Sequence, residues 1–152
     1  MSFQENNSDL LAIKAELTHD PLQLGLTLFP EDDEANSIIL NTIRVECIID
    51  REAVAVNEIT KAIDRDEFVN LSASDRDWLK MITSSGVVNP KAGSEVREGI
   101  LQIFGSATES RANLNLLLTE PTSRINQMFK LGLLSQGGDC TPSDIASART
   151  AT

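Results

Sequence analysis

The sequence predicts an all-α fold: a small domain of about seven short helices with an extended N-terminal arm. Three observations favour this class. Apolar residues recur at helical spacing between Ser, Thr or Asp residues that can cap a helix and Gly or Pro residues that can end one. Helical and extended patterns do not alternate along the chain, which argues against an α/β fold. Heptads do not persist, which excludes a long coiled coil.

At 152 residues the chain has the length of one domain, or of one domain with an appended arm. Residues 1–34 are expected to be that acidic arm, because they hold eight of the 23 acidic residues and a single base, for a net charge of −7. Ser8 can cap a helix that ends at Asp20, since the residue before Pro21 avoids helical geometry. Residues 21–30 are apolar at alternate positions, which predicts an extended segment laid over a groove of this molecule or of another. Its apolar side chains are Leu22, Leu24, Leu26, Leu28 and Phe29.

Residues 35–134 are predicted to form the helical domain. A helix that begins at Pro30 runs into this domain and ends near Asn41. Residues 42–49 are rich in β-branched side chains, but with no evident partner strand they are interpreted as a linker or a helix entry. The remaining elements follow from residues that can cap or end a helix. Asp50 is expected to cap a helix over 51–63, and Asp64 a short turn through Leu71. Further helices are expected from Ser72 or Ser74 to Gly86, over 95–104 after Ser94, over 109–119 after Thr108, and from Thr122 or Ser123 to Gly132.

Residues 135–152 are predicted to be a flexible joint followed by a short C-terminal helix. The joint contains the pair Gly137-Gly138, which gives the backbone wide conformational freedom. Thr141 can cap the last helix, with Pro142 at its first helical position.

Composition and charge exclude several classes of protein. Apolar residues make up 41% of the chain and charged residues 24%, so the chain is not broadly disordered. A net charge of −10 argues against direct nucleic-acid binding, which needs a basic face. No apolar run approaches the length of about 18 residues that a membrane span needs, so we expect no membrane insertion.

No group of residues predicts a catalytic, cofactor-binding or metal site. His19 is the only histidine, and near a helix end it is interpreted as a favourable cation beside the negative end of the helix dipole. Cys47 and Cys140 are expected to be reduced thiols, although a disulfide between them stays open. The acidic clusters at 31–34 and 64–67 lack the spacing of a calcium loop and are interpreted as solvated faces and helix caps. The sequence therefore predicts neither an enzyme nor a cofactor.

A set of helix caps and core positions resembles a known family. The matching positions are Ala62-Ile63-Asp64, Gly86-Val87-Val88, Ile103-Phe104-Gly105, Ser110-Arg111-Ala112, Met128-Phe129 and Asp144-Ile145-Ala146, and upstream Asp20-Pro21 with Leu24-Gly25-Leu26. They resemble small helical virion-associated proteins of tailed bacteriophages. The sequence departs from that pattern at Glu109-Ser110-Arg111, where Thr-Arg is commoner. The resemblance implies synthesis in the host bacterial cytoplasm, a place in the virion and contacts with other virion proteins, and it implies no catalytic residues.

These observations lead to three hypotheses. The first is a non-enzymatic structural component of a tailed-phage particle, in the tail or head–tail neck, present as a homo-oligomer or symmetric ring. The alternative is a phage-encoded acidic intracellular adaptor or regulator that binds a host protein through the acidic arm. An enzyme comes third, because it would need a deep pocket lined by perturbed carboxylates. Under the first hypothesis, the expected interface residues are the five apolar residues of 22–29 and, as second candidates, three arginines whose alternative is a surface or intramolecular salt bridge: Arg97, Arg111 and Arg124.

Overall fold

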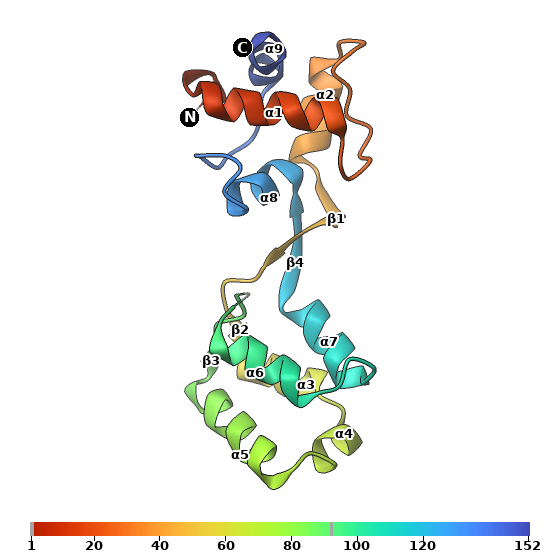
Figure 1. Ribbon diagram of the computed structural model, residues 1–152, viewed down its shortest axis with the longest axis vertical. Helices are drawn as coiled ribbons and strands as arrows, with labels where there is room; N and C mark the ends of the chain where they lie inside the picture. Colours follow the sequence, from red (N-terminus) through yellow and green to blue (C-terminus); the bar gives the residue numbers. More distant parts are fainter. Residues whose placement is uncertain (1, 92) are drawn as a thin grey trace. The chain divides into compact units, whose positions relative to one another are not determined.

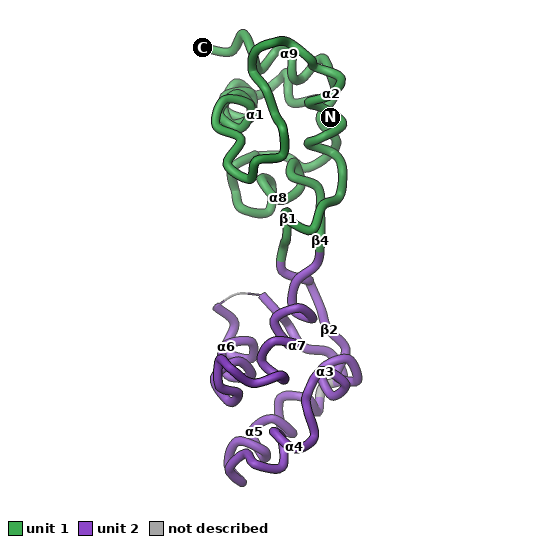
Figure 2. The backbone as a smooth tube through the Cα atoms, turned by 90° about the vertical axis from the view of Figure 1, so that its right-hand side faces the viewer, with its two compact units in different colours: residues 1–49, 121–152 green, residues 50–120 purple. Residues whose placement is uncertain are grey.

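The computed structural model describes residues 2–91 and 93–152, whose helices and strands are labelled in Figure 1. They form two compact units, which Figure 2 shows in different colours. Unit 1 is made of Met1–Ile49 and Pro121–Thr152, so it combines both ends of the chain, and unit 2 is the continuous segment Asp50–Glu120. The expected divisions after residues 34 and 134 do not coincide with these boundaries.

The prediction of an all-α fold is wrong. The described residues are 56% helical and 11% strand, with nine helices and two small antiparallel sheets. Strand β1 spans Ile43–Asp50 and pairs with β4, Thr119–Ser123, while β2, Val54–Ala55, pairs with β3, Val87–Val88. Residues 43–49 are therefore strand rather than linker. Their partner strand lies far along the chain and contains Pro121, a residue that is rare inside sheets, so no local signal identified it.

Unit 1 packs helices from the two ends of the chain around one core (Figure 1). The helices are α1 (Asn7–His19), α2 (Asp33–Asn41), α8 (Arg124–Lys130) and α9 (Pro142–Thr150), with a 3-10 helix η1 over Phe3–Glu5. Both α1 and α2 contact α9. The N-terminal residues are not an extended arm, because they place five side chains in this core: Phe3, Leu10, Ile13, Leu17 and Leu26.

Unit 2 is a bundle of short helices with the small β2–β3 sheet. Its helices are α3 (Val56–Ala62), α4 (Arg65–Val69), α5 (Ala73–Ile82), α6 (Glu95–Ile103) and α7 (Glu109–Leu117), and a 3-10 helix η2 covers Thr83–Ser85. The buried core is aliphatic and aromatic: Val54, Ile59, Leu79, Val88, Ile100, Leu101, Phe104, Leu114 and Leu118.

Six of the predicted helix starts are confirmed, whereas the helix expected from Pro30 begins at Asp33 because Asp32 caps it, and α5 and α7 end at Ile82 and Leu117, before the expected Gly86 and Thr119. The side chain at each cap accepts a backbone N–H of the first turn, as expected of short polar residues at this position: Asp64, Ser72, Ser94, Thr108, Ser123 and Thr141. The cap of α1 is Asn6 rather than Ser8, and Asn6 accepts from the N–H groups of Ser8 and Asp9. Asp50 caps no helix, because the chain continues through β2 before α3 begins at Val56.

Candidate functional site

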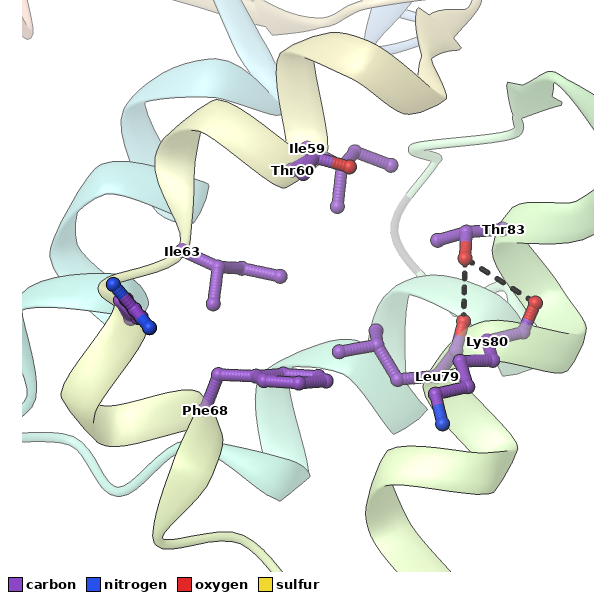
Figure 3. Close-up of a pocket in the computed structure, with 8 residues that line it drawn as sticks. Ile59, Thr60, Ile63, Phe68, Leu79, Lys80 and Thr83 are labelled. Carbon is purple, nitrogen blue, oxygen red and sulfur yellow. Dashed lines mark hydrogen bonds between the residues drawn. The ribbon is translucent and has the colours of Figure 1, made fainter.

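An apolar pocket opens between α3, α4, α5 and η2 of unit 2. It has a volume of about 320 Å³, within the range of small-ligand and side-chain pockets. Ile59 of α3, Phe68 of α4 and Leu79 of α5 point into it, together with Ile63 at the C-terminal cap of α3 (Figure 3). Because the floor is aliphatic and aromatic, the pocket can hold an apolar group.

The polar groups of this pocket are two cations and two hydroxyls. The Thr60 hydroxyl donates to the carbonyl of Val56 at 2.9 Å, and the Thr83 hydroxyl donates to the carbonyl of Leu79 at 2.7 Å. Arg65 and Lys80 supply positive charge at the lining. The lining side chains include neither a carboxylate nor a histidine, so they cannot form a general acid–base pair. The chemistry of this pocket suits an apolar group that is next to a negative charge.

A second candidate surface lies on strand β1 in unit 1. Ile43 is 70% exposed, Val45 77% and Ile48 51%. Isolated exposed apolar residues are normal, but Ile43 and Val45 are two residues apart and project from the same face of the strand, so they form an exposed apolar pair of the kind that marks protein–protein contacts, while Ile48 lies on the opposite face. The β-branched residues at 42–49 were the signal for this surface in the sequence, and the interpretation as a linker missed it.

The predicted interface segment at 22–29 lies on its own unit. Leu26 is 5% exposed in the unit 1 core, Leu24 and Leu28 pack against that core, and Leu22 is half-buried. Phe29 differs, being 69% exposed, with the guanidinium of Arg149 5.7 Å from its ring centre. The structure thus uses the segment to cover a groove of this molecule, which is one of the two arrangements that the sequence left open.

The Asp20 carboxylate fixes the course of that segment. Its two oxygens accept from the backbone N–H groups of Leu24, Gly25 and Leu26 at 2.8, 2.8 and 3.2 Å. Asn36 makes two further hydrogen bonds, accepting from the N–H of Thr27 and donating to its carbonyl. An acidic residue of the N-terminal region therefore has a structural role within unit 1.

The three arginines proposed for an interface all have partners within the molecule. Arg97 pairs with Asp50 and donates to the carbonyl of Pro90 at 2.8 Å.

Arg111 donates to the carbonyl of Leu101 in α6. Arg124 is 7% exposed and pairs with both oxygens of Glu16, at 2.6 and 2.9 Å, while it also donates to the side chain of Gln127. Each of the three guanidinium groups therefore has an acceptor within its own unit.

Two carboxylates of the acidic cluster at 64–67 have structural roles. Asp64 caps α4, and Glu67 accepts from the N–H groups of Glu109 and Ser110 at the start of α7. Hydrogen bonds from Ser110 lower the pKa of the Glu67 carboxyl. His19 is exposed in the last turn of α1, as expected from the helix dipole.

Both cysteines are free and buried, so the disulfide that stayed open does not form. Burial raises the pKa of the Cys47 thiol, and it raises the pKa of Cys140 to about 12. A thiol whose pKa is raised by burial is a poor nucleophile at neutral pH.

Within residues 2–91 and 93–152, no group of three His, Cys, Asp or Glu side chains could hold a metal ion. Over the same residues, every helix is too short or too polar to span a bilayer. Comparison with known proteins gives no relative: no family model, no curated protein and no solved structure is significantly similar to this chain.

Proposed function

We propose that this chain is a non-enzymatic structural component of a tailed-phage particle, in the tail or head–tail neck, and that it acts through protein–protein contacts. The observation that carries the proposal is the exposed apolar surface of β1, where Ile43 and Val45 are 70% and 77% exposed. Soluble monomers avoid leaving an apolar edge strand uncovered, because it invites pairing with other chains. A subunit of an assembly has a neighbour to cover it. The phage particle as the setting rests on the sequence resemblance.

The apolar pocket of unit 2 supports the same proposal. It offers a second contact position with a different chemistry, an apolar floor beside Arg65 and Lys80. Subunits of rings and tubes contact more than one neighbour, and each contact needs its own surface. A surface in each unit suits such a protein.

The alternative, an acidic intracellular adaptor, loses part of its support in the structure. Its basis was the acidic N-terminal region, but four of those carboxylates are used inside unit 1. Asp9 accepts from Ser135, Glu16 pairs with Arg124, Asp20 holds residues 24–26, and Asp33 pairs with Arg149. A partner that approached this region would meet much less unpaired charge than the sequence suggests.

The proposal is tested by mass spectrometry with copy counting on purified particles of the phage that encodes the chain. A stoichiometric copy number that is a multiple of a ring symmetry is the expected result. A count in the hundreds would place the chain in a capsid or tube lattice instead. Absence from particles would overturn the proposal and favour the intracellular adaptor.

A matched pair of variants tests the part played by β1. Ile43→Asp with Val45→Asp is expected to reduce incorporation into particles by about tenfold or more, since charges would replace the core of the contact. Leu116→Asp is the control, because Leu116 is 78% exposed on α7 of unit 2 and belongs to neither surface. Equal incorporation of both variants would exclude β1 as the contact.

A further inference from the structure

We propose that the neighbour that covers β1 is a second copy of this chain, whose own β1 pairs with it antiparallel across a twofold axis at Val45. The inference deepens the proposed function and rests on it for the assembly in which the contact serves. Strand β1 belongs to a sheet of two strands, β1 and β4, so within residues 2–91 and 93–152 one of its edges has no strand beside it. A two-stranded sheet is marginal by itself, and pairing of two copies would join two such sheets into one of four strands.

Backbone geometry identifies which groups lie on the unpaired edge. The N–H of Arg51 donates to the carbonyl of Leu118, next to β4, at 3.0 Å, so the backbone groups of Arg51 face the β4 side, and the carbonyl of Ile48, an odd number of residues away, faces the other edge. Backbone groups of alternate residues along a strand point to the same edge. The N–H and C=O groups of Arg44 and Glu46 therefore lie on the same edge as the Ile48 carbonyl. The groups of Arg44 and Glu46 are those that a second strand would meet, since the Ile48 carbonyl already accepts from the Gln127 side chain.

The side chains of the residues whose backbone groups lie on this edge, Arg44 and Glu46, are complementary in charge. Antiparallel pairing centred on Val45 places Arg44 of one copy opposite Glu46 of the other, and the twofold axis repeats the same pair. Opposite charges directly across a strand pair stabilise it, and like charges destabilise it. Each Arg44–Glu46 pair would also exchange both of its backbone hydrogen bonds.

The present surroundings of the two charges favour this arrangement. Glu46 is exposed, and the Nε of Arg44 is buried without a hydrogen-bond partner in the part of the chain that the structure describes. A carboxylate brought beside Arg44 would supply the missing acceptor. On the other face of the strand, the exposed side chains of Ile43 and Val45 would meet apolar residues of the second copy and leave water. An isologous contact needs a surface that complements itself, and this segment does so in both charge and apolar pattern.

Sedimentation velocity over a range of concentrations tests the proposal on the full chain. We expect a reversible monomer–dimer equilibrium. Arg44→Glu alone and Glu46→Arg alone should each weaken the dimer by about tenfold or more, because each variant places like charges opposite one another. The two single variants mixed together should form a mixed dimer, and Arg44→Glu combined with Glu46→Arg should restore the homodimer. Glu5→Arg is the matched control, being an equal change of charge at an exposed residue of unit 1 outside β1.

A second measurement tests the register. In the proposed pairing the two Val45 residues face each other in a pair without backbone hydrogen bonds, where Cα atoms are about 4.5 Å apart. That spacing allows a disulfide, so Val45→Cys should give a covalent dimer on oxidation. Ile48→Cys is the control and should not, because Ile48 lies opposite a different residue in this register. The native thiols are buried and do not compete.

Three results would overturn the inference: a wild-type chain that is monomeric at every concentration, a dimer that is indifferent to the charge changes, or cross-linking through Ile48→Cys but not through Val45→Cys. None of these bears on whether the chain is present in particles. A monomer that is nevertheless found in stoichiometric copies would leave the proposed function standing and show that β1 contacts a different protein. Circular dichroism of each variant confirms that it is folded.

Discussion

The two units of this chain bury different kinds of side chain. Among the described residues, every buried polar or charged side chain except Ser110 belongs to unit 1. Examples are Asp9, Glu16, Arg124 and Asp144, which are all less than 10% exposed. Apart from Ser110, the buried side chains of unit 2 are apolar. The same chain thus contains one unit specified largely by polar pairing and another specified by apolar packing.

Connectivity explains the difference. Unit 1 joins the two ends of the chain, so α1 and α2 must find α8 and α9 without a short connection to guide them. Directional contacts between distant residues fix that match: Asp9 accepts from Ser135, Lys14 donates to the carbonyl of Ala151, and Asn41 and Cys140 exchange two hydrogen bonds. Buried polar groups can select one arrangement over others even where they add little stability. Unit 2 is continuous, and its short joints and helix caps already limit which helices can meet.

The largest expected effect comes from breaking the ion pair of unit 1. Arg124→Met leaves the Glu16 carboxylate buried without its partner, which should lower the free energy of unfolding of unit 1 by about 3–5 kcal/mol. Far-UV circular dichroism in urea should then show an early transition. Trp78, the single tryptophan, lies in unit 2, so its fluorescence should keep the wild-type midpoint.

The control for this variant is the double change Arg124→Met with Glu16→Leu. It removes both charges and should recover most of the lost stability. A fluorescence midpoint that falls together with the dichroism signal would contradict the separation of the two units.

A packing change should destabilise unit 2 instead. A Cβ on Gly99 of α6 would overlap the indole ring of Trp78, so Gly99→Ala should cost about 3 kcal/mol, the upper range for overpacking. The urea midpoint of Trp78 fluorescence measures this. Gly105→Ala is the matched control, since its Cβ would meet only the Thr108 methyl group at 3.8 Å. Equal midpoints for the two variants would show that Trp78 can move aside.

The pH dependence of unit 1 should include a contribution from Asp144. Burial opposes ionisation of this carboxyl, but hydrogen bonds from Ser2 and Thr141 outweigh burial and lower its pKa. A carboxyl with a lowered pKa in the folded state stabilises the fold above its ordinary pKa, and this contribution is lost as the pH falls.

Asp144→Asn should therefore cost about 1–2 kcal/mol near pH 7 and flatten the decline toward acid, because the amide cannot accept from all of these donors. Circular dichroism midpoints in urea, taken from neutral pH to about pH 3, give the two curves. Asp139→Asn at an exposed position serves as control. Parallel curves for wild type and Asp144→Asn would contradict the assignment.

Removing unit 1 is expected to have the smallest effect, measured as the change in stability of unit 2. A chain limited to residues 50–120 should keep its helical circular dichroism signal and nearly the same urea midpoint of Trp78 fluorescence. The reason is that the two ends of this segment are joined by contacts within the segment itself. Near its two ends, the N–H of Arg51 donates to the carbonyl of Leu118 at 3.0 Å, and Asp50 pairs with Arg97. An unfolded fragment would show that the apolar core of unit 2 depends on the rest of the chain.

The candidate surfaces could be predicted from the sequence only in part. The leucines of 22–29 were predicted to lie over a groove of this molecule or of another, and the structure packs Leu24, Leu26 and Leu28 on the core of unit 1, because periodicity alone cannot tell which molecule such a segment covers. The β-branched residues of β1 indicate a strand in the sequence. A strand can be predicted with certainty only when its partner strand is also identified, and the sequence did not identify β4. The pocket of unit 2 left none, because Ile63, Phe68 and Leu79 are ordinary core residues until the helices are placed.

The sequence by itself determined where many of the helices begin, because N-terminal capping depends on residues within a few positions of each other. Asp64, Ser94, Thr108 and Thr141 show this. Only the tertiary structure decided that β1 pairs with β4, that Glu16 is buried with Arg124, and that both ends of the chain form one unit. Those outcomes depend on contacts between residues far apart in the chain, and local propensity carries no information about which distant residue will supply the partner.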